Sequence, residues 1–329
     1  MEADPQMEGM TVTRRHAVMA FGLLILAGGL VGCGKSAGGS ASQSERSIRF
    51  INADGTITDI PARPRRILST SASVTGTLLA IDAPLIASAS AANGQYFPQW
   101  AGVAKERGIK NIWPAGDVGI EAAIAVKPDL IVVSTGGADS ALAQRAELQA
   151  IAPTIVVDYG SQSWQYLAIQ LGKAAGLENE AAARIAAFER YVVDARGKIA
   201  VPAGKVNIIS YNGSGTTNPI ATANGAHGRL LAGLGFTVED PDPAWHAASE
   251  ARGDFVWAPY EMLPRLTAAT TFLLRANDER VATFLSDPVL ANLPSVRARQ
   301  VQSLGTNSFR IDYYSATQIV DGIVKTFGK

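Results

Sequence analysis

Residues 304–314, LGTNSFRIDYY, bring an aromatic ring, a cation and two phenols together in a chain with only 7% aromatic residues. The segment follows the strand-like run RQVQSL and precedes the last helix-like stretch. Arginine carries a permanent planar cation, and phenylalanine offers a ring face or edge. Phe309 and Arg310 are therefore predicted to bind a flat, anionic ligand, with a core position and a surface ion pair as the respective alternatives. Tyr313 and Tyr314 are predicted to pack the closing helix.

Motifs that would indicate an enzyme are missing from the sequence. The stretch NGSGT (212–216) is not the G-x-S-x-G turn of a nucleophilic serine, and STGGADS (134–140) lacks the Gly-Lys-Ser/Thr of a phosphate loop. GRLLAGLG (228–235) does not follow a strand as a dinucleotide-binding motif does, and no His/Asp/Glu set has metal-ligand spacing. We therefore expect a protein that is not an enzyme and that holds no metal or resident cofactor.

Composition indicates a globular protein of 329 residues that is 47% apolar and 18% charged. Its formal net charge is zero, so no overall field attracts nucleic acid. We expect no nucleic-acid partner.

Continuous apolar strands alternate with helical segments along most of the chain. The predicted strands are RRILST, PLIASAS, the end of EAAIAVKPDLIVVST, APTIVVDYG, KVNIISYNG, TTFLLRAN and RQVQSLGT. Between them, residues 177–200 repeat apolar positions at spacings of three and four, which predicts one long helix. The pattern predicts an α/β protein with two lobes, 48–176 and 201–329, whose mainly parallel sheets are joined by this helix.

Ligands of open α/β sheets bind beyond the carboxyl ends of the strands. In the second half of the chain these ends lead into 212–217, 240–252, Arg275 and the Phe309–Arg310 pair. Cations and rings in such loops are the further candidates for ligand binding: Arg252, Tyr96, Tyr159, Trp164 and Trp245. His227 and His246 are predicted to be loop or helix-cap residues and not ligands.

The N-terminal region predicts export and lipid anchoring. TVTRRHAVMAFGLLILAGGLVGC has a paired arginine and a short apolar run, which is typical of a signal peptide over residues 1–32. LVGC resembles a bacterial lipobox, so Cys33 is predicted to carry the lipid and residues 33–47 to form a flexible, Gly/Ser-rich tether. Arg14 and Arg15 resemble a twin-arginine signal, but RRHAVM lacks its usual continuation, so the general secretory route stays open. Translation from Met1, Met7 or Met10 is equally compatible with this reading.

Several strings resemble the substrate-binding proteins of ABC importers, in the class that carries siderophores, haem or cobalamin. RILSTSASVTGTLLAIDAPLIAS, VAKER, GADSALA, IAPTIVVDY, SWQYLAIQLG and FRIDYYSA are especially similar to ferric-enterobactin-binding members. The resemblance spans residues 48–327 and implies a monomeric lipoprotein on the outer side of the cell membrane. It would capture an anionic, catecholate-like ferric siderophore between its lobes and deliver it to an ABC permease. The segment 92–100, ANGQYFPQW, is shorter than its counterpart in those members.

Two further expectations follow from this resemblance. In the family, one glutamate per lobe docks into the permease. Glu121 and Glu261 match these glutamates because each opens a helix that leads to a strand. The alternative is that each only provides a favourable charge at a helix start.

Haem is the alternative ligand, with Tyr96 or Tyr159 as the iron ligand, and an exported siderophore esterase is a more distant alternative.

Overall fold

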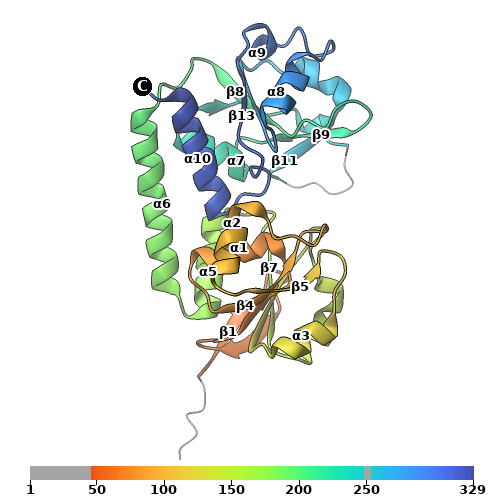
Figure 1. Cartoon of the computed structure of the whole chain (residues 1–329), viewed down its shortest axis with the longest axis vertical. Coiled ribbons are helices and arrows are strands. Elements are labelled where there is room, and N and C mark those ends of the chain that lie inside the picture. Colours follow the sequence, from red (N-terminus) through yellow and green to blue (C-terminus); the bar gives the residue numbers. More distant parts are fainter. Residues whose placement is uncertain (1–45, 248–252) are drawn as a thin grey trace, which may run out of the picture. The chain divides into compact units, whose positions relative to one another are not determined.

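The computed structural model describes residues 46–247 and 253–329, which lie in one compact unit that begins at Glu45. The signal peptide, Cys33, most of the tether and Arg252 lie outside the described residues. Within this unit, two α/β lobes are connected by helix α6 (Glu178–Lys198), which runs along both of them (Figure 1). The predicted fold class is confirmed.

The first lobe contains a parallel five-stranded sheet in the order β5-β4-β3-β6-β7. Its strands are β3 (Ile67–Ser69), β4 (Leu85–Ser90), β5 (Lys110–Pro114), β6 (Leu130–Ser134) and β7 (Thr154–Val157). Every residue of β3, β6 and β7 is buried, because helices cover both faces of the sheet. These helices are α1 (Ala72–Ala80), α2 (Pro98–Glu106), α3 (Ile120–Val126), η1 (Leu142–Gln144), α4 (Arg145–Gln149) and α5 (Trp164–Ala175).

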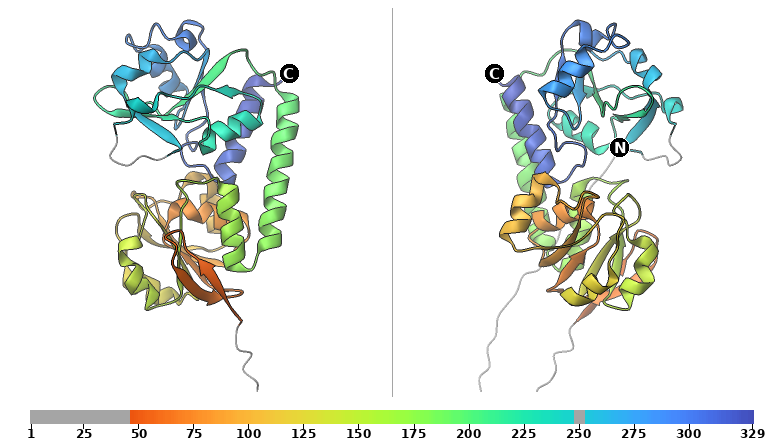
Figure 2. Two further views of the ribbon diagram at one scale, coloured as in Figure 1. Left: turned by 180° about the vertical axis from the view of Figure 1, so that it is seen from behind. Right: turned by 45° about the vertical axis from the view of Figure 1, so that its right-hand side comes forward.

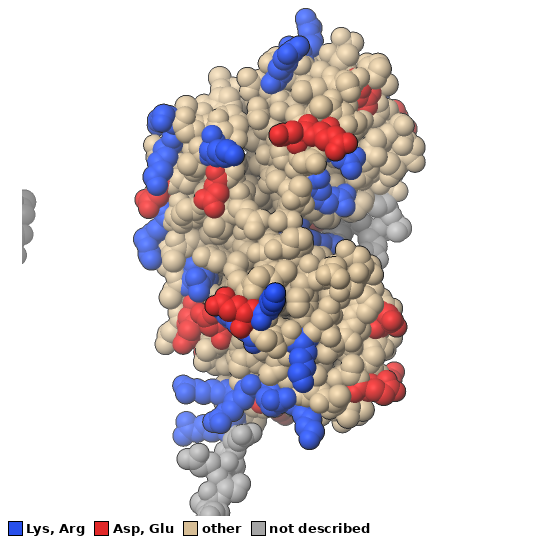
Figure 3. Space-filling view, viewed as in Figure 1, with Lys and Arg blue, Asp and Glu red and all other residues tan. Residues whose placement is uncertain are grey.

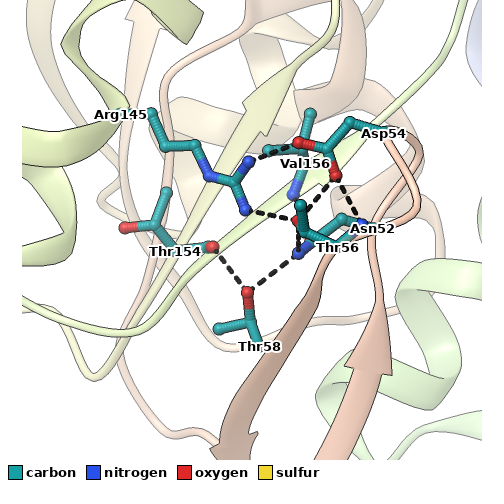
Figure 4. A network of polar contacts seen from close by, with 7 residues as sticks. All are labelled: Asn52, Asp54, Thr56, Thr58, Arg145, Thr154 and Val156. Atoms are coloured by element: carbon teal, nitrogen blue, oxygen red, sulfur yellow. Dashed lines mark hydrogen bonds and ion pairs between the residues drawn. The ribbon is translucent and has the colours of Figure 1, made fainter.

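An antiparallel hairpin, β1 (Ser47–Ile51) and β2 (Ile57–Pro61), is attached to this lobe by a polar network that the sequence did not predict (Figure 4). Asn52 accepts a hydrogen bond from the Val156 backbone N–H at 2.8 Å. Its side-chain amide donates to the hydroxyls of Thr56 and Thr58 at 3.0 and 2.9 Å. An ion pair between Asp54 and Arg145 closes the network, so the hairpin is held to the edge strand β7.

The second lobe contains a mixed sheet in the order β11-β9-β8-β12-β13, with β10 beside β8. Its strands are β8 (Lys205–Ile209), β9 (Thr217–Ala221), β10 (Thr237–Val238), β11 (Phe255–Pro259), β12 (Thr270–Leu273) and β13 (Val301–Ser303). The expected parallel pairing holds for β8, β12 and β13, but β9 runs antiparallel to both β8 and β11. The lobe's helices are α7 (Ala226–Gly233), η2 (Pro243–Trp245), η3 (Tyr260–Arg265), α8 (Asp278–Leu285) and α9 (Pro294–Arg297).

Helix α6 buries Ala181, Phe188, Val192 and Ala195, at the spacings that predicted it. It packs on α5 and on the C-terminal helix α10 (Tyr313–Phe327), which lies beside it (Figure 1). The last turn of α10 is tied to the end of α6 by a hydrogen bond from Ala200 N to Phe327 O at 2.8 Å. In the described ranges, none of the helices combines the length and the apolar character needed to cross a membrane.

The first turn of α10 makes a tight contact with the first lobe. Asp312, the N-cap of α10, is 3% exposed and accepts hydrogen bonds from Ser315 N at 2.9 Å and from the Gln99 side chain of α2 at 3.3 Å. A Cβ atom on Gly76 of α1 would lie 2.5 Å from the Asp312 carboxylate. The two lobes can approach this closely because residue 76 has no side chain. Burial raises the pKa of Asp312 to about 6.

We predict that Gly76→Ala lowers the free energy of unfolding by about 1–3 kcal/mol, because its methyl group overpacks a filled site. Gly102→Ala is the matched control, since Gly102 also lies in a first-lobe helix and a Cβ atom there would meet nothing within 4 Å. The control should be neutral or stabilising by about 0.4–1 kcal/mol. Urea unfolding of both variants measures the difference, and equal effects would show that the Gly76 contact is not tight.

Candidate functional site

Two cavities lie between the lobes, on either side of Phe309 and Arg310. Cavity A has a volume of about 260 Å³ and is lined by Tyr159, Trp164, His227, Arg229 and Phe255, among others. Cavity B has a volume of about 320 Å³ and is lined by Phe97, Gln99, Arg275 and Asn307, among others. Both are also lined by Ser73 and Ala138 and by Phe309 and Arg310. We call the last pair the ridge, because it borders both cavities.

The first-lobe wall of cavity A consists of the segments that follow β3, β6 and β7, at the carboxyl ends of parallel strands. Asp139 holds these loops together. Its buried carboxylate accepts hydrogen bonds from the Ser71 hydroxyl at 2.7 Å, from Ser73 N at 2.8 Å and from the Tyr159 hydroxyl at 3.0 Å. Gly137 has a φ of +95°, and a Cβ there would lie 1.9 Å from the Tyr159 hydroxyl, so only glycine fits beside this tyrosine.

The second-lobe wall is a stack of aromatic rings and a cation. The Phe309 ring stacks on Phe255, with centroids 5.4 Å apart and an interplanar angle of 16°. The Arg275 guanidinium lies 4.5 Å from the centroid of Phe309. Arg275 follows β12 directly, has a φ of 50°, and donates to Ser210 and Asn212. The ring of Phe309 is therefore held in place while it still lines both cavities.

Arg310 extends toward the first lobe. Its guanidinium lies 5.6 Å from the Tyr159 ring centroid and 5.5 Å from that of Phe309. It forms no ion pair with any residue in the described ranges. The surface ion pair that was the alternative for Arg310 is absent from that part of the chain.

Three arginines, Arg229, Arg275 and Arg310, line the two cavities together with Asp139, Asp254 and Asp312. Arg229, in the first turn of α7, also lines cavity A and donates to the carbonyl of Asn224. Basic side chains are visible at the recess between the lobes in Figure 3. Desolvation by burial, and then repulsion from Arg280 and Arg310, lower the pKa of Arg275. An anion placed among these arginines would relieve that repulsion.

His227 connects α7 to the ridge. It is 3% exposed, and its Nε2 donates to the Ser308 carbonyl at 2.7 Å. Burial lowers the pKa of His227 to about 4, so the ring is neutral at neutral pH. Ser308 in turn accepts a hydrogen bond from Arg275 N at 3.1 Å. His227 therefore positions the segment that carries the ridge.

The predicted site residues separate into two groups. Phe309, Arg310, Tyr159 and Trp164 come together at cavity A. Trp164 is only 4% exposed, and it packs edge-on against Phe188 and Tyr313, so most of its ring belongs to the core. Arg252 lies outside the described residues.

Tyr96 and Trp245 lie outside both cavities. The hydroxyl of Tyr96 donates to the Ile109 carbonyl at 3.1 Å, and its ring packs on Trp100 in the first lobe. Trp245 packs against an apolar cluster of the second lobe. Both rings cover their own lobes, so the structure does not place them at the cleft. Tyr313 and Tyr314 begin α10 and are half-buried, which confirms their packing role.

Arg229, His227 and Phe255 line cavity A, although the sequence did not predict them as site residues. All three depend on the antiparallel pair β9–β11, which places Asn224–Arg229 and Gly253–Phe255 at cavity A. The expected loop 212–217 does not line either cavity. Strand β9 was not predicted because it contains Pro219, and proline argues against a strand inside a sheet.

Glu121 and Glu261 occupy comparable exposed positions in the two lobes. Glu121 lies in the first turn of α3, which leads to β6, and Glu261 lies in the first turn of η3, which leads to β12. Neither residue lines cavity A or B. Their helix-start positions agree with the expectation, while their docking role stays a prediction.

In the described part of the chain, no three His, Cys, Asp or Glu side chains lie close enough together to hold a metal ion.

Comparison with known proteins gives matches over most of the chain. Residues 67–307 match a family model described as periplasmic binding protein. The ferric enterobactin-binding periplasmic protein FepB of Escherichia coli is 39% identical over 279 residues, covering 82% of this chain and 87% of the relative. The probable siderophore-binding lipoprotein YfiY of Bacillus subtilis is 24% identical over 297 residues, covering 87% and 89%. The solved structure of holo-ViuP has a TM-score of 0.84 and 50% identity, and covers 87% of this chain and 96% of that chain. These matches confirm the resemblance found in the sequence.

We predict that His227→Ala lowers the free energy of unfolding by about 2–3 kcal/mol at pH 7.5, because it leaves the Ser308 carbonyl unpaired. The difference from the wild type should shrink as the pH falls. In the unfolded chain the imidazole takes up a proton near pH 6.5, whereas in the folded protein it stays neutral down to about pH 4. The stability that the neutral ring contributes is thus present above pH 6.5 and is lost toward pH 4, by about 3 kcal/mol. Urea unfolding across this range measures the difference, and a constant value would contradict the burial of a neutral ring.

Proposed function

Because this chain belongs to the periplasmic binding protein family, we propose that it captures a ferric siderophore between its two lobes and delivers it to an ABC permease for iron uptake. The ligand is an anionic, catecholate-like complex. The observation that carries this proposal is the ridge, where the stacked ring of Phe309 and the cation of Arg310, which has no ion-pair partner among the described residues, face Tyr159 of the other lobe.

The chemistry of such a ligand matches the cleft. A ferric tris-catecholate is a bulky anion whose rim consists of aromatic rings. Arg310 and Arg275 supply planar guanidinium cations, and Phe309 supplies a ring that borders both cavities. An arginine over an aromatic ring contributes about 0.5–2 kcal/mol, with the higher values where water is excluded. The name of the relative FepB, a ferric enterobactin-binding protein, supports the same ligand class.

Haem is less well supported as the ligand. A tyrosine binds haem iron as a phenolate, but burial raises the pKa of Tyr96 to about 12, and burial and Asp139 raise the pKa of Tyr159. Tyr159 donates its hydroxyl hydrogen to Asp139, and Tyr96 lies outside the cavities. Both features oppose iron ligation.

We propose binding without catalysis. The histidine in the cleft, His227, already donates to the Ser308 carbonyl and is buried, so it is not placed to activate a serine for ester hydrolysis.

The remaining parts of the chain complete the proposal. Residues 1–32 act as the signal peptide, Cys33 carries the lipid, and residues 33–47 tether the binding unit to the outer side of the cell membrane. Lobes 48–176 and 201–329, joined by the helix at 177–200, act as a monomer without a nucleic-acid partner. The lipoprotein name of the relative YfiY supports the anchor.

Arg310→Ala should weaken binding of an anionic ferric catecholate by about 10- to 100-fold, because a charge-assisted contact of roughly 1.5–3 kcal/mol is lost. Arg310→Lys should recover only part of this affinity, since a point charge does not reproduce the planar fork. The loss should be smaller for a neutral ferric hydroxamate. Fluorescence titration of the wild type and of both Arg310 variants with each ligand measures these affinities. Arg297→Ala, which replaces an exposed arginine of α9, is the matched control. Equal, small losses for both ligands would place Arg310 outside the binding site.

Reversing both docking charges, Glu121→Arg with Glu261→Arg, should abolish iron-siderophore uptake by cells and leave the dissociation constant of the purified protein unchanged. The control is the double variant Glu147→Arg with Glu279→Arg, which reverses a different exposed glutamate in each lobe. This control should retain uptake. If uptake survives the Glu121/Glu261 double reversal, these glutamates do not dock into the permease and only provide a favourable charge at a helix start.

Cys33→Ala should release the protein from the membrane fraction while its ligand affinity stays the same, because the binding unit begins beyond the tether. Fractionation after a high-salt wash measures this. A variant that still sediments with membranes would disprove the lipid anchor.

A further inference from the structure

A third cavity, cavity C, lies where α5, α6 and α7 meet. Its volume is about 430 Å³. Figure 2 (left) shows this side of the unit, with α7 beside α6 and above α5. The walls are largely apolar and include Trp164, Phe188, Val192, Val193, Leu230 and Ile311. This cavity has no part in the binding of an anion described above.

Cavity C adjoins cavity A. Five residues line both of them: Ser163, Trp164, Ala226, Arg229 and Ile311. The small side chain of Ala226 stands on this border, and Ala316 and Gly233 are the other small residues in the walls of cavity C. A ligand held in cavity A therefore has apolar space next to it.

The walls of cavity C include apolar surface that is exposed to water. Val193 of α6 is 67% exposed although it lines this cavity. Water against such a surface is unfavourable, and an apolar group that replaces it gains free energy. A cavity of this size is within the range that holds small-molecule ligands.

The charges at cavity C indicate what kind of group it accepts. Arg229 lies on the border with cavity A, whereas Glu189 lines cavity C alone and is exposed. An anionic head is attracted toward the arginine and repelled by the glutamate. An uncharged chain is not repelled by the glutamate and does not need the arginine.

We propose that cavity C is a subsite for an apolar arm of the ligand, so that the protein takes siderophores that carry an alkyl or acyl chain. The iron-binding head occupies cavity A, and the chain lies between α5, α6 and α7. This inference rests on the proposed function, because the head must be an anionic iron complex in cavity A.

The test uses a series of ferric catecholates with one head and either no arm, a short linear alkyl arm or a longer one. In the wild type, affinity should rise by up to about fourfold for each added methylene until cavity C is full. Val193→Glu places a charge on the apolar wall and should remove this gain, while the affinity for the arm-free ligand stays the same. Val289→Glu, an exposed valine outside all three cavities, is the matched control and should keep the gain.

The outcomes separate this inference from the proposed function. If the arm-free ferric catecholate binds and arm length has no effect, the subsite is wrong and the proposed function stands. A gain that persists in Val193→Glu would place the arm elsewhere and also overturn the subsite. If the arm-free ligand does not bind at all, the proposed function itself fails, and the subsite with it.

Discussion

The contact between Gly76 and the Asp312 carboxylate joins the start of the C-terminal helix to the first lobe beside the cleft. Asp312 caps α10, and the ridge lies only two to three residues before it in the chain. Because α1 carries no side chain at position 76, α10 can rest directly on the first lobe, where Gln99 also holds the carboxylate. The burial that raises the pKa of Asp312 is the cost of this arrangement.

On each side of this contact, hydrogen bonds fix one wall before any ligand arrives. Asp139 joins three loops of the first lobe, and the links from His227 and Arg275 through Ser308 hold the ridge. The ridge cation has no ion-pair partner among the described residues, and the neighbouring arginine has a lowered pKa. Such a wall is electrostatically unfavourable by itself and favourable once an anion is present. Pre-formed walls also lower the ordering cost of binding.

Much of the fold could be predicted because buried parallel strands are apolar throughout and the 177–200 helix has a clear period. Phe309 and Arg310 could be found because they follow a strand that the sequence shows plainly. Arg229 and His227 could not, since their place depends on the pairing of β9 with β11, and Pro219 obscures β9. The sequence does not show that Tyr96 and Trp245 line neither cavity, because an aromatic residue in a loop can face its own lobe or the cleft, and only tertiary packing decides. The Gly76–Asp312 contact joins residues far apart in the chain and has no local signal at all.

We propose that one ferric siderophore binds between the lobes and touches both. The most direct test is a crystal structure of the protein with a ferric catecholate siderophore, in which anomalous scattering locates the iron. We predict a single iron site between Tyr159 and the ridge, with ligand atoms in contact with Arg310. An iron site outside cavities A and B, or a ligand in contact with only one lobe, would contradict it.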